Sequence, residues 1–323
     1  MNLSNYFSPP ISTKRWVALF CFMEDLMMKI WSYALLVFLG GCSYGVVSTF
    51  VKIAYSQGFS LSEITGCQYF MGSIMLWVIS IFVPKVRLKY KQWLSLMISG
   101  IPMGLTGIFY NQALSYVDAS FAIILLLQFT WISIILQYIF NKKVPNRKNL
   151  IATGIILFGS LLASGFLRTE MTFSITGIGF GMFAALSFAF FIFLSGRTGI
   201  TIHPIYKSAI MTTGASLIIF IFLPPVFLIN DSLTSGLWIY GLLTGFFGSL
   251  IPPILFNIGM PKVGGSLGTI LSASELPMAV TMSTCILHET VSLLQWIGVV
   301  IIIFGIAYPN IQIRQTRLSA NEY

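Results

Sequence analysis

The chain has 323 residues, of which 56% are hydrophobic and only 8% are charged, and its mean hydropathy is +0.88. Soluble domains carry about 25% charged residues, so an ordinary soluble fold is excluded. The apolar runs are continuous rather than alternating, which predicts an all-α membrane protein and not a β-barrel. The net charge of +9 does not indicate nucleic-acid binding, because the basic residues lie in short connections between the apolar runs.

The first 29 residues do not fit the pattern that follows. The stretch "RWVALFCFMEDLMMK" is apolar but is interrupted by Glu24 and Asp25. It is too short to span a bilayer and lacks a small-residue cleavage site, so it does not indicate a signal peptide. Either residues 1–29 form an N-terminal cytoplasmic segment with an amphipathic surface helix, or the natural chain starts near Met28. We favour the second interpretation slightly.

Ten membrane-spanning helices are expected in the rest of the chain, joined by short connections that leave no room for a soluble domain. The predicted spans are 30–52, 62–83, 93–114, 117–140, 148–167, 175–196, 206–229, 236–259, 265–286 and 291–311. With the N-terminus inside, only Lys52 and Arg168 of the 18 basic residues fall on the outer side. The positive-inside rule therefore predicts a multi-pass plasma-membrane protein with both termini in the cytoplasm.

An internal repeat appears when the chain is shifted against itself by 146 residues. Asn111 then falls on Asn257, and the register runs without a gap from Ile108 on Ile254 to Gly159 on Gly305. We expect two five-helix repeats, at 30–167 and 175–311, followed by a cytoplasmic tail at 312–323. An odd number of spans per repeat inverts the second copy relative to the first. Both copies lie in one chain, so a monomer could be complete.

Inverted repeats are a common construction of secondary transporters, in which the substrate site lies near the middle of the membrane between the copies. The pattern therefore predicts a carrier of a small molecule embedded in the lipid bilayer.

Three motifs carry a resemblance to a known family. They are "NQALSYVDASFAIILLLQF", "LSASELPMAV" and "HETVSLLQWIGVVIIIFGI", the last with Glu289 followed nine residues later by Gly298. In these motifs the chain resembles the ten-span EamA-like branch of the drug/metabolite transporter superfamily. The first copy departs from the pattern, with Lys143 in place of an acid and Trp131 in place of Pro277. The resemblance implies transport but not a substrate, because members carry amino acids, drugs, nucleotide sugars and other metabolites.

Glu275 is the leading candidate for a substrate- or proton-binding residue. It lies halfway along a predicted span, where an acid costs about 2.5–3.5 kcal/mol to insert. Gly268, Ser272, Glu275 and Ala279 share one small, polar helical stripe that should face a cavity. An acid in such a place can exchange a proton for a cationic substrate. The alternative is a hydrogen-bonded acid that holds helices together.

Pro277 should add to this site. It cannot donate to the carbonyl of Ala273 one turn earlier, which would leave that carbonyl as an extra acceptor.

The equivalent span of the first repeat supplies two further candidates. Phe129 aligns with Glu275, so an aromatic ring would face the acid across the cavity and suit an amphipathic cation. Gln128 is either a donor to substrate or a link between helices. Tyr44, in a glycine-rich stretch of the first span, is a weaker candidate. Lys52 should extend to the outer interface rather than bind substrate.

Four residues suggest gating or a structural role. Asn111 and Asn257 are repeat mates near span ends, and we expect them to close the turns into the next spans. Pro252 and Pro253 follow two glycines and predict a broken or kinked helix, which could be a gate or static curvature.

The sequence contains no phosphate-binding glycine loop, no nucleophile motif and no metal-ligand spacing. We therefore expect no cofactor, no metal and no enzymatic activity, and transport driven by a proton gradient or by exchange. The direction should be export of a small metabolite or drug. The alternatives are an uptake or exchange carrier without proton coupling, and a receptor or intramembrane enzyme that does not transport.

Overall fold

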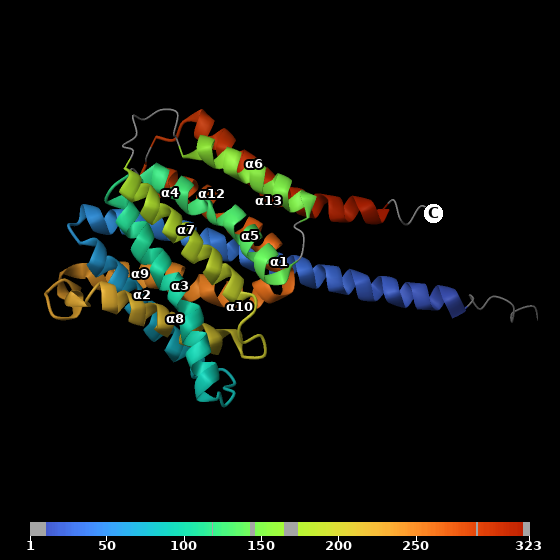
Figure 1. Ribbon diagram of the computed structural model, residues 1–323, viewed down its shortest axis with the longest axis horizontal. Coiled ribbons are helices and arrows are strands. Elements are labelled where there is room, and N and C mark those ends of the chain that lie inside the picture. Colours follow the sequence, from blue (N-terminus) through green and yellow to red (C-terminus); the bar gives the residue numbers. More distant parts are fainter. Residues whose placement is uncertain (1–10, 118, 143–145, 165–173, 289, 319–323) are drawn as a thin grey trace, which may run out of the picture.

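The computed structural model describes residues 11–117, 119–142, 146–164, 174–288 and 290–318. At 11–29, 114, 119–120 and 310–318 it describes the backbone only. The described chain is helical throughout and contains no strand (Figure 1). The predictions above that concern Lys143, Arg168 and Glu289 involve residues outside the described ranges.

The first repeat contains six helices. They are α1 (Ile11–Ser56), α2 (Leu61–Ser80), α3 (Tyr90–Leu114), α4 (Ala119–Leu127), α5 (Phe129–Asn141) and α6 (Arg147–Ala163).

The second repeat has the same plan with more interruptions. Its α-helices are α7 (Ile175–Ser195), α8 (Pro204–Phe222), α9 (Trp238–Thr244), α10 (Ile251–Val263), α11 (Gly265–Ser272), α12 (Glu275–Ile286) and α13 (Leu293–Leu318). A 3₁₀ turn, η1 (Val226–Leu228), and two π-helical segments, η2 (Leu233–Leu237) and η3 (Gly245–Leu250), lie between α8 and α10.

Six helices of the described chain are long and apolar enough to cross a membrane. They cover Ile30–Ser56, Tyr90–Ala113, Phe121–Asn141, Ile175–Ser195, Pro204–Phe222 and Leu233–Val263, and Leu293–Pro309 is a shorter apolar helix. The other helices of the described chain are too short or not apolar enough to meet the same two criteria. For example, α6 has only 17 residues, and α11 and α12 are separate helices. Ten spans therefore remain a prediction.

Two predicted spans are broken in the middle. The span expected at 117–140 is split at Gln128 between α4 and α5, and the span expected at 265–286 is split at Ala273 and Ser274 between α11 and α12. Gln128 falls on Ser274 in the 146-residue register, so the two repeats break at the same place. The sequence did not predict either break. At Gln128 it contains no neighbouring glycine or proline that would have indicated one.

A broken or kinked helix was expected near Pro252 and Pro253; the structure instead changes there from a π-helical to an α-helical segment without interruption. The π-helical segment η3 ends at Leu250, and both prolines lie in the first turn of α10. Proline is tolerated there because the first amides of a helix have no partner within it.

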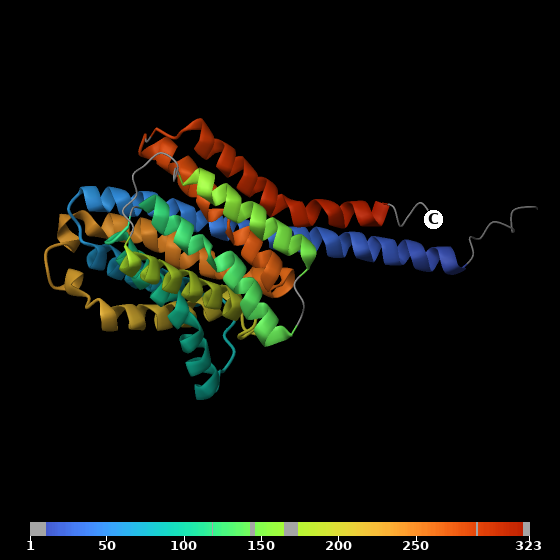
Figure 2. The ribbon, with the colours of Figure 1, turned by 45° about the horizontal axis from the view of Figure 1, so that its top comes forward.

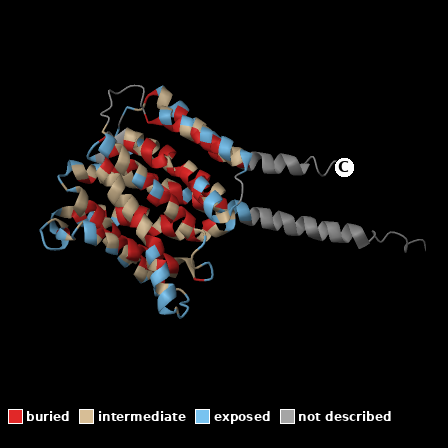
Figure 3. Ribbon diagram, in the orientation of Figure 1, coloured by how far each residue is buried: buried red, intermediate tan, exposed pale blue. Residues whose placement is uncertain are grey.

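The bundle encloses a continuous buried core, seen in red in Figure 3. Helices α6 and α13 lie side by side in Figures 1 and 2, and α1 enters the bundle at the same end from which α13 leaves it. Helix α1 packs closely on the second repeat, because a Cβ at Gly41 would overlap the side chain of Ser274 and one at Gly45 would overlap the carbonyl of Glu275. The glycine-rich stretch of α1 thus fixes the position of α12.

Candidate functional site

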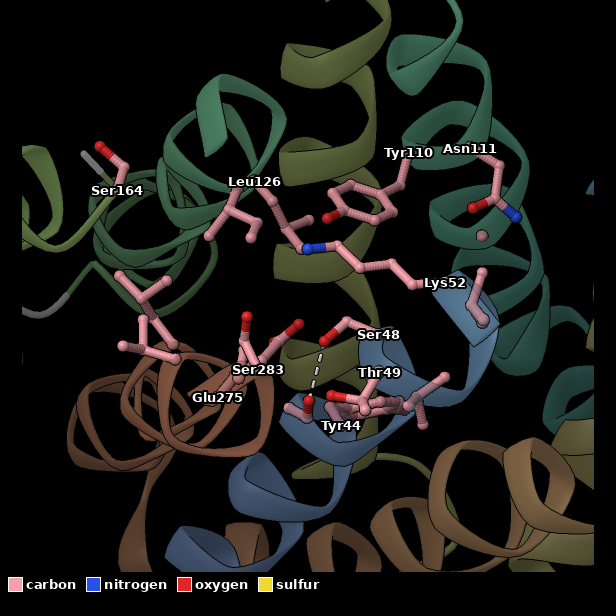
Figure 4. A pocket seen from close by; sticks show the side chains of 18 of the residues that line it. Tyr44, Ser48, Thr49, Lys52, Tyr110, Asn111, Leu126, Ser164, Glu275 and Ser283 are labelled. Atoms are coloured by element: carbon pink, nitrogen blue, oxygen red, sulfur yellow. Dashed lines mark hydrogen bonds between the residues drawn. The ribbon is translucent and has the colours of Figure 1, made fainter. Parts of the chain in front are cut away.

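A cavity of about 580 Å³ opens between the two repeats, at the end of the bundle where α1, α3 and α12 finish. The carboxyl-terminal half of α1 forms one wall, and α3 and α4 form another. Helix α12 and the segment after it form a third wall, next to α1 (Figure 4). The exposed residues Lys52 and Thr290 lie among its lining residues, so the cavity is open to the surface there.

Glu275 lines this cavity from the first position of α12, directly after the break. In Figure 4 its side chain projects toward the open space beside Ser283. The unpaired amides and the dipole at a helix amino terminus stabilise a negative charge there. Its carboxyl group makes no hydrogen bond and no ion pair with any described residue. The sequence placed Glu275 inside a helix, whereas the break puts it at a helix start.

A stripe on α1 lies next to Glu275 on the cavity wall, because α1 and α12 pack directly on each other. Tyr44, Ser48 and Lys52 are spaced four residues apart and line the same wall. The ring of Tyr44 packs edge-on against Phe188 at 5.6 Å between centroids. The Ser48 hydroxyl donates to the carbonyl of Gly45 at 2.9 Å. Lys52 thus lines the cavity at its exposed opening, which the sequence did not predict.

Aromatic rings cover much of the remaining wall. Tyr69 of α2, Tyr110 of α3 and Phe188 of α7 join Tyr44 around the cavity. The hydroxyl of Tyr69 donates to the carbonyl of Met103 at 3.0 Å, which fixes its ring. Such rings attract a cation through their negative faces.

Phe129, the aromatic residue that the sequence proposed for this role, does not line the cavity. It is fully buried and packs edge-to-face on Phe188 at 4.8 Å between centroids. It therefore supports the aromatic wall from behind.

Gln128 and Ser272 also lie away from the cavity. The Gln128 amide donates to the carbonyl of Ile124 at 2.9 Å and accepts from the indole of Trp131 at 2.8 Å, so it satisfies its own helix break. The Ser272 hydroxyl is buried and donates to the carbonyl of Gly268 at 2.9 Å. The break after Ser272 turns it out of line with Glu275. The predicted stripe is therefore reduced to Glu275 and Ala279.

The carbonyl that Pro277 was expected to free is not left as a free acceptor. The amide of Leu276 donates to the Ala273 carbonyl at 3.4 Å, through the tight turn at the break. The Ser274 hydroxyl donates to the carbonyl of Phe38 in α1 at 2.7 Å and fastens the break to the first repeat.

Asn111 and Asn257 make matching contacts rather than closing turns. Asn111 lies within α3, lines the cavity and donates to the Thr65 hydroxyl of α2 at 2.6 Å. Asn257 lies within α10, is buried and donates to the Ser208 hydroxyl of α8 at 2.8 Å. Each asparagine thus joins two helices of its own repeat.

Among the described residues, the site combines one carboxyl group, one lysine and five aromatic rings, those of Tyr44, Tyr55, Tyr69, Tyr110 and Phe188. Sequence reasoning missed Lys52, Tyr69 and Tyr110. The spacing of Lys52 eight residues after Tyr44 was an available signal for the first of these. In the described part of the chain, no group of three His, Cys, Asp or Glu residues could hold a metal ion.

The chain was compared with known proteins. The model of the EamA-like transporter family matches it twice, at residues 31–165 and 175–310. No curated protein matches it significantly. A solved structure titled "Crystal structure of protein" has a TM-score of 0.70 and 15% sequence identity, over 86% of this chain and 97% of that chain. That likeness concerns the fold alone, whereas the family match covers most of the sequence. The chain therefore belongs to the EamA-like transporter family.

Proposed function

We propose that this membrane transporter is a proton-coupled exporter of a small, partly apolar solute with a cationic group. One observation carries the proposal. The carboxyl group of Glu275 faces an open cavity and has no hydrogen-bonding or ionic partner among the described residues. A partnerless acid inside a membrane costs about 2.5–3.5 kcal/mol, and a structural acid would recover part of that through hydrogen bonds. Here the binding of a proton or of a cation compensates for this free-energy cost.

The cavity offers such a solute complementary surfaces. Tyr44, Tyr69, Tyr110 and Phe188 contact its apolar part and the face of its cationic group. Glu275 can hold either a proton or this cation but not both, which ties the movement of one to the movement of the other.

The direction of the opening agrees with export. Basic residues of the described chain cluster in the connections at the end of the bundle opposite the cavity, as in 85–91 and at Lys142, Arg147 and Lys148. The positive-inside rule assigns that end, and both termini, to the cytoplasm. The cavity then opens outward, where an exporter releases its solute and takes up a proton. Ten spans in two five-helix units, 30–167 and 175–311, complete this arrangement in the plasma membrane.

Lys52 favours a second candidate, an exchanger without proton coupling. A lysine and an acid on neighbouring walls of one cavity suit a solute with both a negative and a positive group. In that case Glu275 recognises the solute and carries no proton.

The test begins with the purified protein and a thermal-shift screen of amino acids, nucleosides and cationic drugs. The best stabilising compound is then loaded into proteoliposomes with an imposed pH difference. Glu275→Gln should remove proton-driven flux, because a neutral amide cannot exchange a proton. Asp231→Asn is the matched control, since it removes an exposed acid outside the cavity and should transport normally.

The two candidates give different results in this assay. Counterflow that ignores pH in the unaltered protein favours the exchanger. Normal proton-driven transport by Glu275→Gln contradicts the coupling role of that residue.

A further inference from the structure

The connection between α2 and α3, residues 81–91, carries a dense group of basic side chains and is called the basic connection below. Lys85, Arg87, Lys89 and Lys91 occupy alternate positions, and all four are exposed. The sequence contains no acid between Glu63 and Asp118. None of the four basic side chains makes an ion pair with another described residue. The basic connection therefore presents four positive charges without a counter-charge from its own surroundings in the chain.

The acids whose side chains are described lie elsewhere in the bundle. Glu63 lies in the first turn of α2, about 25 Å along that helix from the basic connection. Asn230 donates to Glu63 at 2.7 Å, which places the neighbouring Asp231 at the same end of the bundle. Glu275 lines the cavity. No described acid can therefore neutralise the basic connection, and an anion from outside the chain is needed.

Apolar side chains alternate with these charges and are even more exposed. The exposed fractions are 84% for Phe82, 54% for Val86 and 79% for Tyr90. An aqueous surface disfavours such a row of apolar groups, whereas a membrane interface favours it, because acyl chains cover the apolar parts and headgroups meet the polar ones. The alternation of charge and apolar surface indicates a ligand that has both an anionic and an apolar part.

The basic connection is held in place by packing directly beside the charges. Leu88 and Trp93 pack on a buried cluster that includes Ile202 of the α7–α8 connection. The amide of Lys89 donates to Gln92 Oε1 at 3.0 Å and fixes the start of α3. In Figures 1 and 2 this start projects from the bundle in both views, and Figure 3 shows that its tip is exposed. The charges are thus fixed on a projection that other described elements leave open.

The position of the basic connection along the chain agrees with the membrane surface. The apolar span of α3 covers Tyr90–Ala113, so its first residue lies within the basic connection. Charges at the start of a span lie at the level of the lipid headgroups. Anionic phospholipids give this level a negative potential that attracts basic segments.

We propose that the basic connection binds an anionic phospholipid of the leaflet on the side of the termini. Lys85, Arg87 and Lys89 contact its phosphate, and the guanidinium of Arg87 can hold two phosphate oxygens at once. Phe82 and Tyr90 pack against its glycerol and acyl chains. This site is separate from the cavity and does not depend on which solute the protein carries.

Thermal unfolding of the purified full-length protein in detergent tests the site. The micelles contain added phosphatidylglycerol, or phosphatidylcholine with the same acyl chains, or soluble glycerol phosphate. A ligand that binds the folded protein raises its melting temperature, so phosphatidylglycerol should raise it by about 3 °C or more above phosphatidylcholine. Glycerol phosphate should have no effect, because it lacks the apolar part. Added salt should weaken the effect of phosphatidylglycerol, since the charges are exposed.

A triple variant, Lys85→Gln with Arg87→Gln and Lys89→Gln, removes most of the charge. Each basic side chain near an anionic surface strengthens binding about fivefold, so the phosphatidylglycerol concentration at half of the shift should rise about a hundredfold. The exposed positions of these side chains make a loss of folding unexpected. If this variant does not fold, Phe82→Ser with Tyr90→Ser replaces it. That pair keeps the charges, removes exposed apolar groups, and should weaken phosphatidylglycerol binding several-fold while leaving the effect of salt.

The matched control is the triple variant Lys142→Gln, Arg147→Gln and Lys148→Gln. It removes the same number of charges from another connection at the same end of the bundle, and should leave the half-point nearly unchanged.

Four results would overturn the proposal. They are equal stabilisation by the two phospholipids, an unchanged half-point in the variants of the basic connection, and an equal loss in the control, which would mean that the whole face attracts lipid without a site. The fourth is equal stabilisation by glycerol phosphate or by soluble polyglutamate, which would assign the basic connection to a free phosphate or to an acidic protein segment.

Discussion

The open and closed halves of this bundle are built from equivalent residues but differ in what they do with them. In the open half, α4 and α12 stand apart and expose Glu275, Lys52 and tyrosines to a cavity. In the closed half, α5 and α11 meet through Gln137 and Ser266, and the polar groups are buried. The difference teaches that equivalent helices of the two repeats can stand apart in one half and meet in the other, so the repeat alone does not decide which half is open.

The largest expected difference between the halves concerns an added acid. Phe129→Glu puts a carboxyl group into the fully buried position that corresponds to Glu275. It removes ring packing on Phe188 and adds an unpaired acid, so we expect a loss of more than about 3 kcal/mol or no folded protein. Ala279→Glu adds the same acid at the cavity wall and should cost less than about 1 kcal/mol.

Thermal unfolding of both variants in one detergent checks this prediction. Equal melting temperatures would mean that the closed half is as hydrated as the cavity and that the contrast between them does not hold.

A medium effect is expected from glycines that set helix distances in each half. A Cβ at Gly45 meets the backbone carbonyl of Glu275, which cannot move without α12, so Gly45→Ala should destabilise the protein by about 1–3 kcal/mol. A Cβ at Gly265 meets only the end of the Gln137 side chain, at 2.6 Å from Nε2. Gly265→Ala should therefore leave stability nearly unchanged and loosen the Gln137 contact.

The melting temperatures of these two glycine variants in one detergent check the prediction. A Gly265→Ala protein that melts as early as Gly45→Ala would show that the contact at the closed end is as rigid as the α1–α12 contact.

The smallest effect separates the two asparagines. Asn257→Ala leaves the buried Ser208 hydroxyl without a partner and should cost about 1–3 kcal/mol. Asn111→Ala leaves Thr65 at the wall of an open cavity, where water can replace the lost donor, and should cost about 1 kcal/mol or less. Chemical unfolding of the two variants compares them, and a larger loss for Asn111→Ala would contradict the assignment of open and closed halves.

The sequence predicted the helical class, the repeat and a cavity-facing position for Glu275 because each leaves a local pattern of hydropathy or of matched letters. It did not predict the breaks at Gln128 and Ser274, since tertiary contacts such as Ser274 to Phe38 stabilise them. Those breaks turn Ser272 out of line with Glu275, which is why the predicted stripe was only half correct. That Lys52 lines the cavity and Phe129 does not was missed for a related reason. Which residues face a cavity depends on how far apart two helices stand, and spacing along one helix does not contain that distance.

Glu275 is the one carboxyl group among the described residues that lines the cavity. A carrier that trades one proton for one singly charged cation at a single acid moves no net charge in a cycle. The membrane voltage then contributes nothing to its driving force, and the pH difference sets the whole limit. Each unit of pH is worth about 1.4 kcal/mol and sustains about a tenfold concentration ratio of the solute. Within the proposed mechanism, this count of one acid fixes how steep a gradient the protein can build.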